Sequence, residues 1–355
     1  MPAKVSSNHK HASHLSSSSC AITIVRTVKK GAGTYDRREA LVIVNPVAHN
    51  APRAHRRGEV DELMHSAGWT VRWEETVEPG QAKALAGRAA ESGVPLVIAC
   101  GGDGTVNEVA NGIVGSQTAL GTIPSGMSNI WAREAGLDHK TVEAMRLMIT
   151  GERRLVDMGK SGGRHFLLLA GFGIDASITE NVRPGVKDKI GTASYILSAF
   201  QEMLRWKSVP ATVRFDGYER HVDFLMALVG NTRLYAGLTK IASRAVINDG
   251  RLDVCVYEGD GTRDIILHAI RTIAQIHRKS DKALYRRVNK VEFQWDARIP
   301  VQLDGEVLGQ FPTEAEVVPA SLWVAVPEAY ASKLFMPEVV PVSAPGLNLA
   351  RPRTA

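Results

Sequence analysis

Residues 96–108 read Leu-Val-Ile-Ala-Cys-Gly-Gly-Asp-Gly-Thr-Val-Asn-Glu. The apolar run Leu96–Cys100 is typical of a buried strand, and a helical pattern begins at about Thr105. Three glycines lie between them. Because glycine has no Cβ, backbone N–H groups in such a turn can approach phosphate oxygens, and the helix N-terminus adds partial positive charge. The stretch therefore predicts a polyphosphate cradle between a strand and a helix.

A simpler interpretation of the same stretch is a tight turn followed by a capping box, in which Thr105 and Glu108 satisfy the first N–H groups of the helix. We expect this capping box as well. It accounts for two residues but leaves the three glycines and Asp103 unexplained. The stretch matches neither the dinucleotide fingerprint GxGxxG nor a Walker loop, because no Gly-Lys-Ser/Thr follows it.

Strand and helix patterns alternate on both sides of this turn. Apolar strands are expected at 41–44, 69–73, 96–100 and 120–123; helices are expected at 60–67, 82–89 and 105–114 and from about 129 and 138. This alternation predicts a doubly wound parallel sheet with helices on both faces, and we place this α/β nucleotide-binding domain at residues 39–155.

Beyond it the pattern changes to strands joined by Asp-Gly turns at 216, 249 and 304. Strands are expected at 166–169, 211–215, 222–229, 252–257, 291–295, 301–303 and 322–326, with helices at 192–206 and 262–277. We expect an antiparallel β-sandwich or barrel domain at 156–335, and leave open whether its last segment returns to the first domain. Residues 1–38 and 336–355 are expected to be a disordered basic arm and a tail.

Charge is distributed unevenly along the 355 residues. The formal net charge is +6, from 43 basic and 37 acidic side chains, and residues 1–38 account for all of it with seven basic residues and one acid. The rest of the chain is balanced, which argues against nucleic acid as a partner. The three cysteines have no CxxC spacing, which favours a reducing compartment. No signal peptide and no apolar run near the roughly 18 residues that span a bilayer is present, so we expect a cytoplasmic protein.

Residues 101–112, Gly-Gly-Asp-Gly-Thr-Val-Asn-Glu-Val-Ala-Asn-Gly, closely resemble the nucleotide-binding signature of the diacylglycerol kinase catalytic domain family, which includes sphingosine and ceramide kinases. Four further motifs resemble that family in the same order, and the resemblance covers about residues 40–328. They are Asn45-Pro46, the segment Pro124 to Asn129, the segment Ala170 to Ala176, and Asp304-Gly305-Glu306.

The resemblance implies an ATP-dependent lipid kinase that acts at a membrane surface, with a β-sandwich domain at 156–335 that binds the lipid substrate and the active site in the cleft between the domains. It implies that Asp103 acts through Mg²⁺ or near the phosphates and that Asp304 or Glu306 is the base; we favour Glu306, because Asp304 suits the first position of an Asp-Gly turn. The implied nucleotide contacts are Asn45, Pro46, Thr76, Gly101, Gly102, Asp103, Gly104, Thr105, Asn107, Glu108, Gly126, Ser128 and Asn129.

The resemblance also implies a structural Mg²⁺ near Asp249, with Asp249 as the side-chain ligand and carbonyls near Val246 and Arg251. An ordinary turn is an equal alternative, because only one acid is present. The lipid acceptor, diacylglycerol or a sphingoid or ceramide lipid, is left open, as is the oligomeric state, with a homodimer as one alternative.

Two other functions remain at this point. NAD kinases share the Gly-Gly-Asp-Gly-Thr loop, but the Asn-Glu-Val-Ala-Asn-Gly continuation and the Asp-Gly-Glu turn argue against that activity. A catalytically silent lipid- or nucleotide-binding protein is suggested by Met127 and Ile130, which stand where the family usually has Thr and Asp.

Overall fold

The computed structural model describes residues 35–335 apart from 36, 52–53, 182–204, 236–238, 310–312, 329, 331 and 333. The tail expected at 336–355 lies outside the described residues. So do all but residues 35, 37 and 38 of the basic arm, and all but 205 and 206 of the helix expected at 192–206. Among the described residues, no helix combines the length and hydrophobicity needed to cross a bilayer.

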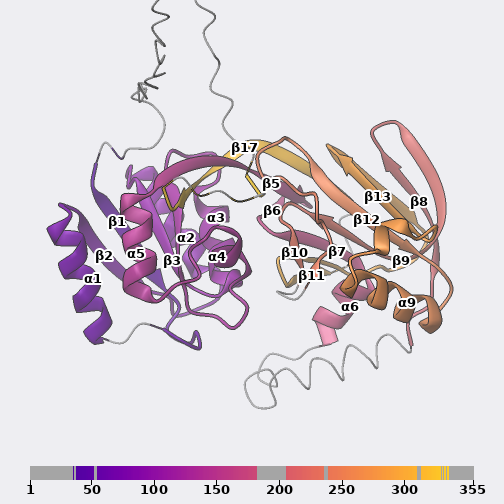
Figure 1. The fold of residues 1–355 in the computed structure, drawn as a ribbon, viewed down its shortest axis with the longest axis horizontal. Coiled ribbons are helices and arrows are strands. Elements are labelled where there is room, and N and C mark those ends of the chain that lie inside the picture. Colours follow the sequence, from indigo (N-terminus) through magenta and orange to yellow (C-terminus); the bar gives the residue numbers. More distant parts are fainter. Residues whose placement is uncertain are drawn as a thin grey trace, which may run out of the picture. The chain divides into compact units, whose positions relative to one another are not determined.

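The first part of the chain forms a parallel sheet covered by helices on both faces. The sheet contains strands in the order β2-β1-β3-β4, with α1 packed beside α5 on one face and α2 beside α3 on the other (Figure 1). The elements are β1 (Glu39–Val44), α1 (Ala54–Ser66), β2 (Thr70–Glu75), α2 (Gln81–Glu91), β3 (Leu96–Gly101), α3 (Asp103–Ile113), β4 (Ala119–Pro124), α4 (Ile130–Glu134) and α5 (Thr141–Thr150).

Hydrophobic patterning explains this arrangement. β3 is buried along its whole length, as expected for a parallel strand with helices on both faces. In α2 the buried residues are Ala82, Leu85, Ala86 and Ala89, which repeat at the spacing of one helix face.

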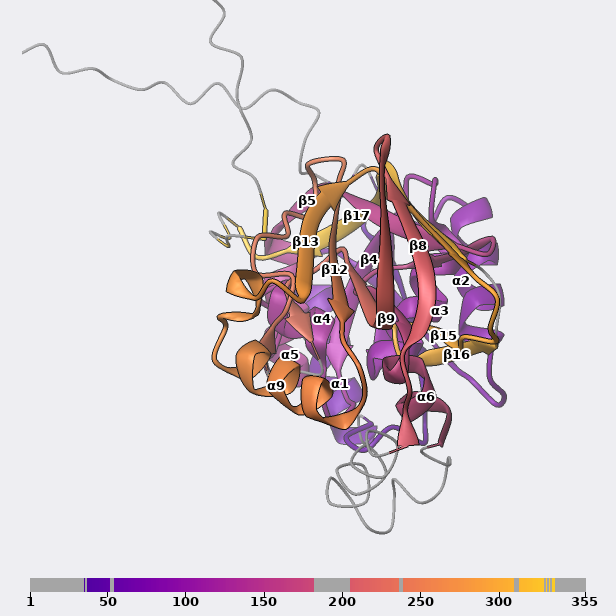
Figure 2. The same ribbon diagram turned by 90° about the vertical axis from the view of Figure 1, so that its right-hand side faces the viewer.

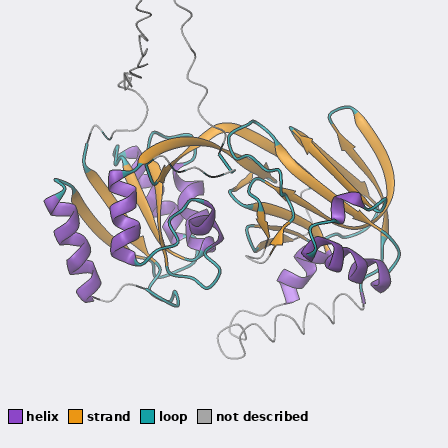
Figure 3. Ribbon diagram, viewed as in Figure 1, coloured by secondary structure: helices purple, strands orange, loops and turns teal. Residues whose placement is uncertain are grey.

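The second part of the chain is mainly antiparallel (Figures 2 and 3). Its strands are β5 (Glu152–Ser161), β6 (Arg164–Phe166), β7 (Leu169–Gly173), β8 (Val209–Phe215), β9 (Tyr218–Gly230), β10 (Leu234–Tyr235), β11 (Thr239–Lys240), β12 (Leu252–Glu258), β13 (Ala283–Val288), β14 (Lys290–Trp295), β15 (Val301–Leu303), β16 (Glu306–Gly309) and β17 (Glu314–Val326). Its helices are α6 (Ile174–Asn181), α9 (Thr262–Ile273) and the short 3-10 helix η1 (His277–Lys279). The predicted fold class, an α/β domain followed by a β-sandwich-like domain, is confirmed.

β17 connects the two groups of strands. It pairs antiparallel with β14 and β5, and near its end Trp323 and Val324 pair in parallel with Ala119 and Leu120 of β4. β5 runs through the boundary expected at residue 155 without a break. The parallel sheet therefore acquires its last strand from the C-terminal end of the described chain.

Several expected elements have other bounds in the structure: α1 begins at Ala54 rather than at 60, and β17 begins at Glu314 rather than at 322. Two further elements are divided or shortened. The strand expected at 166–169 is two strands, β6 and β7, because residues 167 and 168 leave the ladder and give their N–H groups to a carboxylate described below. The helix expected at 262–277 ends at Ile273, and Gln275 takes a left-handed conformation with φ 57° that cannot continue an α-helix.

Candidate active site

Three loops meet at the carboxyl ends of β1, β3 and β4. Asn45 N–H donates to the Cys100 carbonyl at 2.9 Å, Ser125 N–H to the Gly101 carbonyl at 3.0 Å, and Asn50 N–H to the Ser125 carbonyl at 2.9 Å. The strand order reverses between β1 and β3, and in doubly wound sheets ligands bind in the crevice at such a point. Three of the sequence motifs thus lie together where this fold places a ligand.

The glycines of these loops have two different functions. A Cβ on Gly126 would lie 2.6 Å from the Gly102 Cα, and one on Gly101 would lie 2.3 Å from the Thr105 Oγ1, so these glycines permit close packing. A Cβ on Gly104 would meet only the Glu306 Oε1, at 3.9 Å. Gly104 therefore leaves open space at the first turn of α3, as a phosphate cradle requires.

Asp103 and Asn129 fix the loop after β4. The Asp103 carboxylate accepts the N–H groups of Ile130 at 3.1 Å and Trp131 at 3.0 Å, and burial raises its pKa above the ordinary value. Asn129 has φ 46°, and its side chain pairs with the N–H and carbonyl of Gly126. Asp103 thus holds α4 against the start of α3 through both carboxylate oxygens.

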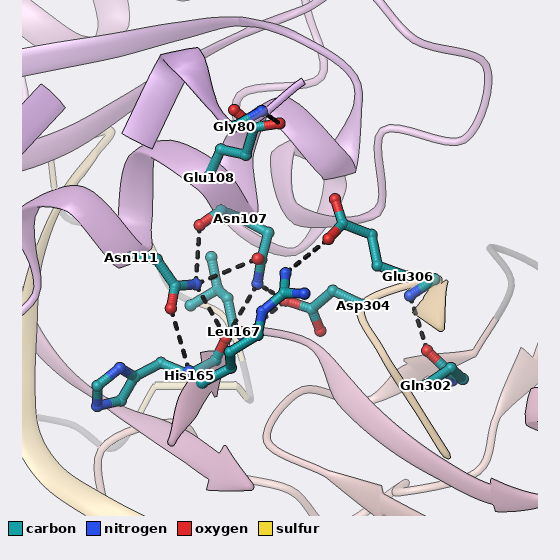
Figure 4. Close-up of polar contacts among 11 residues, drawn as sticks. Gly80, Asn107, Glu108, Asn111, His165, Leu167, Gln302, Asp304 and Glu306 are labelled. Atoms are coloured by element: carbon teal, nitrogen blue, oxygen red, sulfur yellow. Dashed lines mark hydrogen bonds and ion pairs between the residues drawn. The ribbon is translucent and has the colours of Figure 1, made fainter. Parts of the chain in front are cut away.

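The expected capping box is wrong. α3 begins at Asp103, before Thr105, and its N-cap is Gly102, which has no side chain to form a capping bond. The Glu108 carboxylate instead accepts N–H groups from Gly80 at 3.0 Å and Ala82 at 3.1 Å, and so caps the neighbouring helix α2 (Figure 4). The Thr105 Oγ1 lies 3.4 Å from the Asn45 Nδ2 and accepts its hydrogen bond. A long-range partner for Glu108 replaced the local one that the spacing predicted.

Asp304 joins α3 to the β-rich strands (Figure 4). One carboxylate oxygen accepts Asn107 Nδ2 at 2.6 Å and Leu167 N–H at 2.7 Å; the other accepts the N–H groups of Leu168 and Leu169, both at 2.9 Å. Burial raises the pKa of Asp304 to about 6. Four donors occupy both oxygens, so Asp304 acts as a structural acceptor.

The Asp-Gly turn explains why Asp304 faces inward. Asp304 and Gly305 have φ values of 49° and 88°, the conformation of a tight two-residue hairpin turn between β15 and β16. Asn111 supports the same junction by donating to the His165 carbonyl at 2.9 Å and accepting the His165 N–H at 3.1 Å. No local sequence pattern indicates these contacts.

Glu306, two residues further on, faces the nucleotide loops. Its carboxylate pairs with the Arg164 guanidinium at 2.6 Å, and both side chains are partly exposed. A cleft of about 520 Å³ is lined by Glu306 together with Asn45, Pro46, Val47, Thr76, Val77, Glu78, Pro79, Ala82, Gly104, Thr105 and Glu108. Glu306 therefore shares a cavity with the predicted phosphate-binding residues.

Six of the predicted nucleotide residues line this cleft, and the others do not; those others are Gly101, Gly102, Asp103, Asn107, Gly126, Ser128 and Asn129. The Thr76 hydroxyl donates to the Val44 carbonyl at 3.4 Å at the cleft wall. Ser128 and Met127 are exposed on the loop before α4. Arg164, which no motif singled out, is the partner that orients Glu306.

A second cavity of about 240 Å³ lies in the β-rich part and is mostly apolar. Its polar wall includes Asp175, which is buried, accepts a hydrogen bond from the Tyr235 hydroxyl and has a raised pKa because of burial. Gln302 donates to the other Asp175 oxygen at 2.7 Å and accepts the Gly305 N–H at 2.7 Å. Asp175 is thus linked through one side chain to the turn that carries Glu306, although it was not among the residues expected in the site.

The expected metal ligand Asp249 is already part of an ion pair. Its carboxylate pairs with the Arg287 guanidinium and accepts the Arg251 N–H at 3.0 Å. Within the part of the chain that the structure describes, no group of three or more His, Cys, Asp or Glu side chains could hold a metal ion. A metal at Asp249, with carbonyls near Val246 and Arg251, stays a prediction.

Two family models match the chain. The diacylglycerol kinase catalytic domain matches residues 39–161, and the YegS C-terminal NAD kinase beta sandwich-like domain matches residues 169–326. The chain belongs to the diacylglycerol kinase catalytic domain family of lipid kinases, as its motifs predicted.

Individual relatives agree with this assignment. The chain is 32% identical over 278 residues to a probable lipid kinase YegS-like of Chromohalobacter salexigens, covering 77% of this chain and 88% of the relative. It is 27% identical over 300 residues to a diacylglycerol kinase of Bacillus subtilis, covering 84% and 99%. A crystal structure assigned as a diacylglycerol kinase of Bacillus anthracis has the same fold, with a TM-score of 0.71, 24% identity and coverage of 84% and 98%.

Proposed function

We propose that the protein transfers the γ-phosphoryl group of ATP to the hydroxyl group of a lipid. The observation that carries the proposal is the shared cleft: the open first turn of α3 at Gly104 and the carboxylate of Glu306 face the same cavity. Phosphoryl transfer needs mainly positioning, charge neutralisation and a base for the hydroxyl proton. In this proposal the loops position the nucleotide, and Glu306 is the base.

The reaction follows from these positions. The N–H groups at the start of α3, together with Asn45 and Thr105, bind the phosphates of ATP at the cleft floor. Glu306 accepts the proton of the lipid hydroxyl while the hydroxyl oxygen of the lipid forms a bond to the γ-phosphorus of ATP. The bond between that phosphorus and the oxygen that bridges it to the β-phosphorus breaks, which releases ADP. Arg164 keeps the Glu306 carboxylate oriented, at 2.6 Å.

Glu306 suits this role better than Asp304. Asp304 uses both oxygens to accept four N–H groups, whereas Glu306 pairs with Arg164 and lines the cleft. A base must be free to take a proton within reach of the acceptor. We therefore assign Asp304 to holding α3 beside the β-rich domain.

The lipid would enter from the β-rich domain. The cavity of about 240 Å³ offers apolar walls from Ile174, Leu225 and Ile265 for an acyl chain. The buried Asp175 beside Tyr235 offers a hydrogen-bond acceptor for a polar headgroup. We propose this cavity as the acceptor pocket, in a domain extending from 156 to 335 beside a nucleotide domain at 39–155.

We propose that Mg²⁺ enters with ATP. Among the described residues no group of three or more His, Cys, Asp or Glu side chains could hold a metal ion, and Mg²⁺ commonly binds through substrate phosphates with few carboxylates. When bound, it would neutralise phosphate charge.

A transfer assay tests the proposal. Purified protein is incubated with labelled ATP and Mg²⁺ and with diacylglycerol, a sphingoid base, ceramide or NAD, and the Glu306→Gln variant is the matched control. Label in one of the lipids, lost in the variant, is expected. Label in NAD would instead favour a NAD kinase, and ATP binding without transfer to any acceptor would favour a silent binding protein.

The departures Met127 and Ile130 do not favour the silent alternative. Met127 is 71% exposed, and Ile130 contributes to the loop through its backbone N–H, which any residue except proline provides. The Asn129 side chain still closes the loop on Gly126.

A further inference from the structure

Helix α9 has an apolar outer edge that the fold does not need. Four of the eight large hydrophobic side chains that the described part of the chain exposes are Ile266 (39% exposed), Ile270 (57%), Ile273 (74%) and Ile276 (47%). The first three repeat at i, i+4 and i+7, so they form one stripe along α9. Figures 1 and 2 place α9 at the lower edge of the β-rich domain.

The opposite face of α9 already anchors the helix. Ile265, His268 and Thr272 are buried; the His268 Nε2 bonds the Glu258 carbonyl at 2.8 Å, and the Thr272 hydroxyl bonds the Tyr257 hydroxyl at 2.9 Å. The outer isoleucines are therefore not required to hold the helix in place. Exposing a contiguous apolar stripe usually marks a surface that is covered by a partner.

The charge around this stripe identifies the partner. Residues 262–282 contain five basic side chains, Arg263, Arg271, Arg278, Lys279 and Lys282, against two acids, Asp264 and Asp281. Lys282 pairs with Asp264 at 2.9 Å, which leaves four basic side chains against one acid. The two histidines of this segment have pKa values lowered by burial and add no charge near neutral pH. An apolar stripe flanked by basic residues fits the interface of an anionic bilayer. Two copies of this face packed together would bring like charges into contact.

The stripe also borders the proposed acceptor pocket. Ile273 is the most exposed of the four isoleucines and at the same time lines the cavity of about 240 Å³, together with Ile265 and Ala269 of α9. A lipid leaving a membrane at this edge would meet the apolar wall of the pocket directly, without exposing its chains to water.

We propose that the outer face of α9, with Ile266, Ile270 and Ile273, together with Ile276 just after the helix and the basic residues beside them, docks on an anionic lipid bilayer and delivers the lipid acceptor to the adjoining pocket. The delivery step rests on the proposed lipid kinase function; the docking itself does not.

The test uses the full-length protein and sedimentation with vesicles of phosphatidylcholine alone or mixed equally with phosphatidylglycerol. The test variant is Ile266→Glu/Ile270→Glu, because neither residue lines the pocket. The control is Tyr218→Glu, which puts one negative charge on another exposed apolar side chain, at the start of β9, and is compared with the single variants Ile266→Glu and Ile270→Glu as well as with the double variant. Transfer to a dispersed short-chain diacylglycerol is measured in parallel.

We expect the wild type and Tyr218→Glu to bind the anionic vesicles, more weakly in high salt, and the double variant to bind roughly tenfold less or worse. Transfer to the dispersed acceptor should be unchanged in the double variant. Equal vesicle binding by the double variant and the wild type, or no binding by the wild type, would overturn the proposal. A smaller oligomer in the double variant, with vesicle binding retained, would assign the face to a second copy. If no protein transfers phosphate but vesicle binding still depends on α9, the kinase proposal fails and the docking surface remains.

Discussion

Replacing Glu306 with Gln separates the chemistry of the site from its structure. The substitution keeps the size of the side chain and removes its negative charge, and with it the ability to take a proton. Loss of general base catalysis typically costs about 10²- to 10⁴-fold in rate, which corresponds to about 3–5 kcal/mol in the activation free energy. We therefore expect kcat to fall by at least about 100-fold, with little change in the KM for ATP.

The stability of the Glu306→Gln variant should hardly change. The ion pair with Arg164 joins side chains that are 38% and 39% exposed, and exposed pairs contribute about 0–1 kcal/mol. Glu316→Gln is a matched control, because Glu316 is also partly exposed and pairs with Lys160 at 3.8 Å, but does not line the cleft. That control should keep its full turnover.

Asp304→Asn should show a different pattern. Its amide group would face at least two N–H donors that now share a carboxylate oxygen, and each unsatisfied donor costs about 1–3 kcal/mol. Relief of the buried charge offsets part of this cost, so we expect a net loss of about 1–3 kcal/mol in the free energy of unfolding. Turnover rates, ATP titrations and urea unfolding are measured for the wild type and for the Glu306→Gln, Glu316→Gln and Asp304→Asn variants. Together they separate loss of the base from loss of structure. A Glu306→Gln variant that retains more than about a tenth of the wild-type kcat refutes our assignment of the base.

The remaining predictions concern the loops and one buried acid. Gly104→Ala adds a helix-favouring residue in open space, so we expect the free energy of unfolding to stay unchanged or rise by up to about 1 kcal/mol, while the KM for ATP increases. Gly126→Ala should instead lower the free energy of unfolding by about 1–3 kcal/mol, because its Cβ would overlap the Gly102 backbone. Equal unfolding midpoints for the two variants would contradict this difference. Asp103→Asn should abolish transfer and lower stability by about 1–3 kcal/mol, because one of the two N–H groups at the start of α4 loses its acceptor; full activity in the transfer assay would remove Asp103 from the site. Burial raises the pKa of Asp253 from 3.8 to about 6, so the folded state binds the proton more tightly, and this residue destabilises the fold as pH rises from about 4 to above 6, by about 3 kcal/mol at pH 7. Asp253→Asn should therefore gain stability relative to the wild type at pH 7.5 but not at pH 4.5 in urea unfolding, and an equal difference at both values would show that the buried charge is not the cause.

Patterns that depend on neighbours in the chain were predictable. The run from Leu96 into Gly101 predicted β3 and its turn, and the alternation of strands and helices predicted the doubly wound sheet, because burial on both faces leaves a distinctive spacing. The Asp-Gly dipeptides at 216 and 304 predicted hairpin turns, and both aspartates have positive φ.

Partners far apart in the sequence were not predictable. Glu108 has the spacing of a capping box, but its carboxylate caps α2 through Gly80 and Ala82, 28 and 26 residues away. Arg164 reaches Glu306 across 142 residues, and no local pattern marks either contact. Spacing reports the periodicity of one element, whereas these contacts depend on how two elements pack.

The two acids of the Asp-Gly-Glu turn show how this difference bears on function. The sequence nominated both as the base, and the turn preference of Asp304 was the only local reason to choose between them. The left-handed turn directs Asp304 toward the N–H groups of residues 167–169, which donate hydrogen bonds to its carboxylate. Glu306 begins the next strand and faces the cleft beside Gly104. One hairpin thus supplies both the fixed acceptor that fastens α3 to the β-rich domain and the freer carboxylate that can take a proton. Because both acids sit on the same turn, a change that moves Asp304 should also move Glu306, so Asp304 variants should lose activity through position rather than through proton transfer.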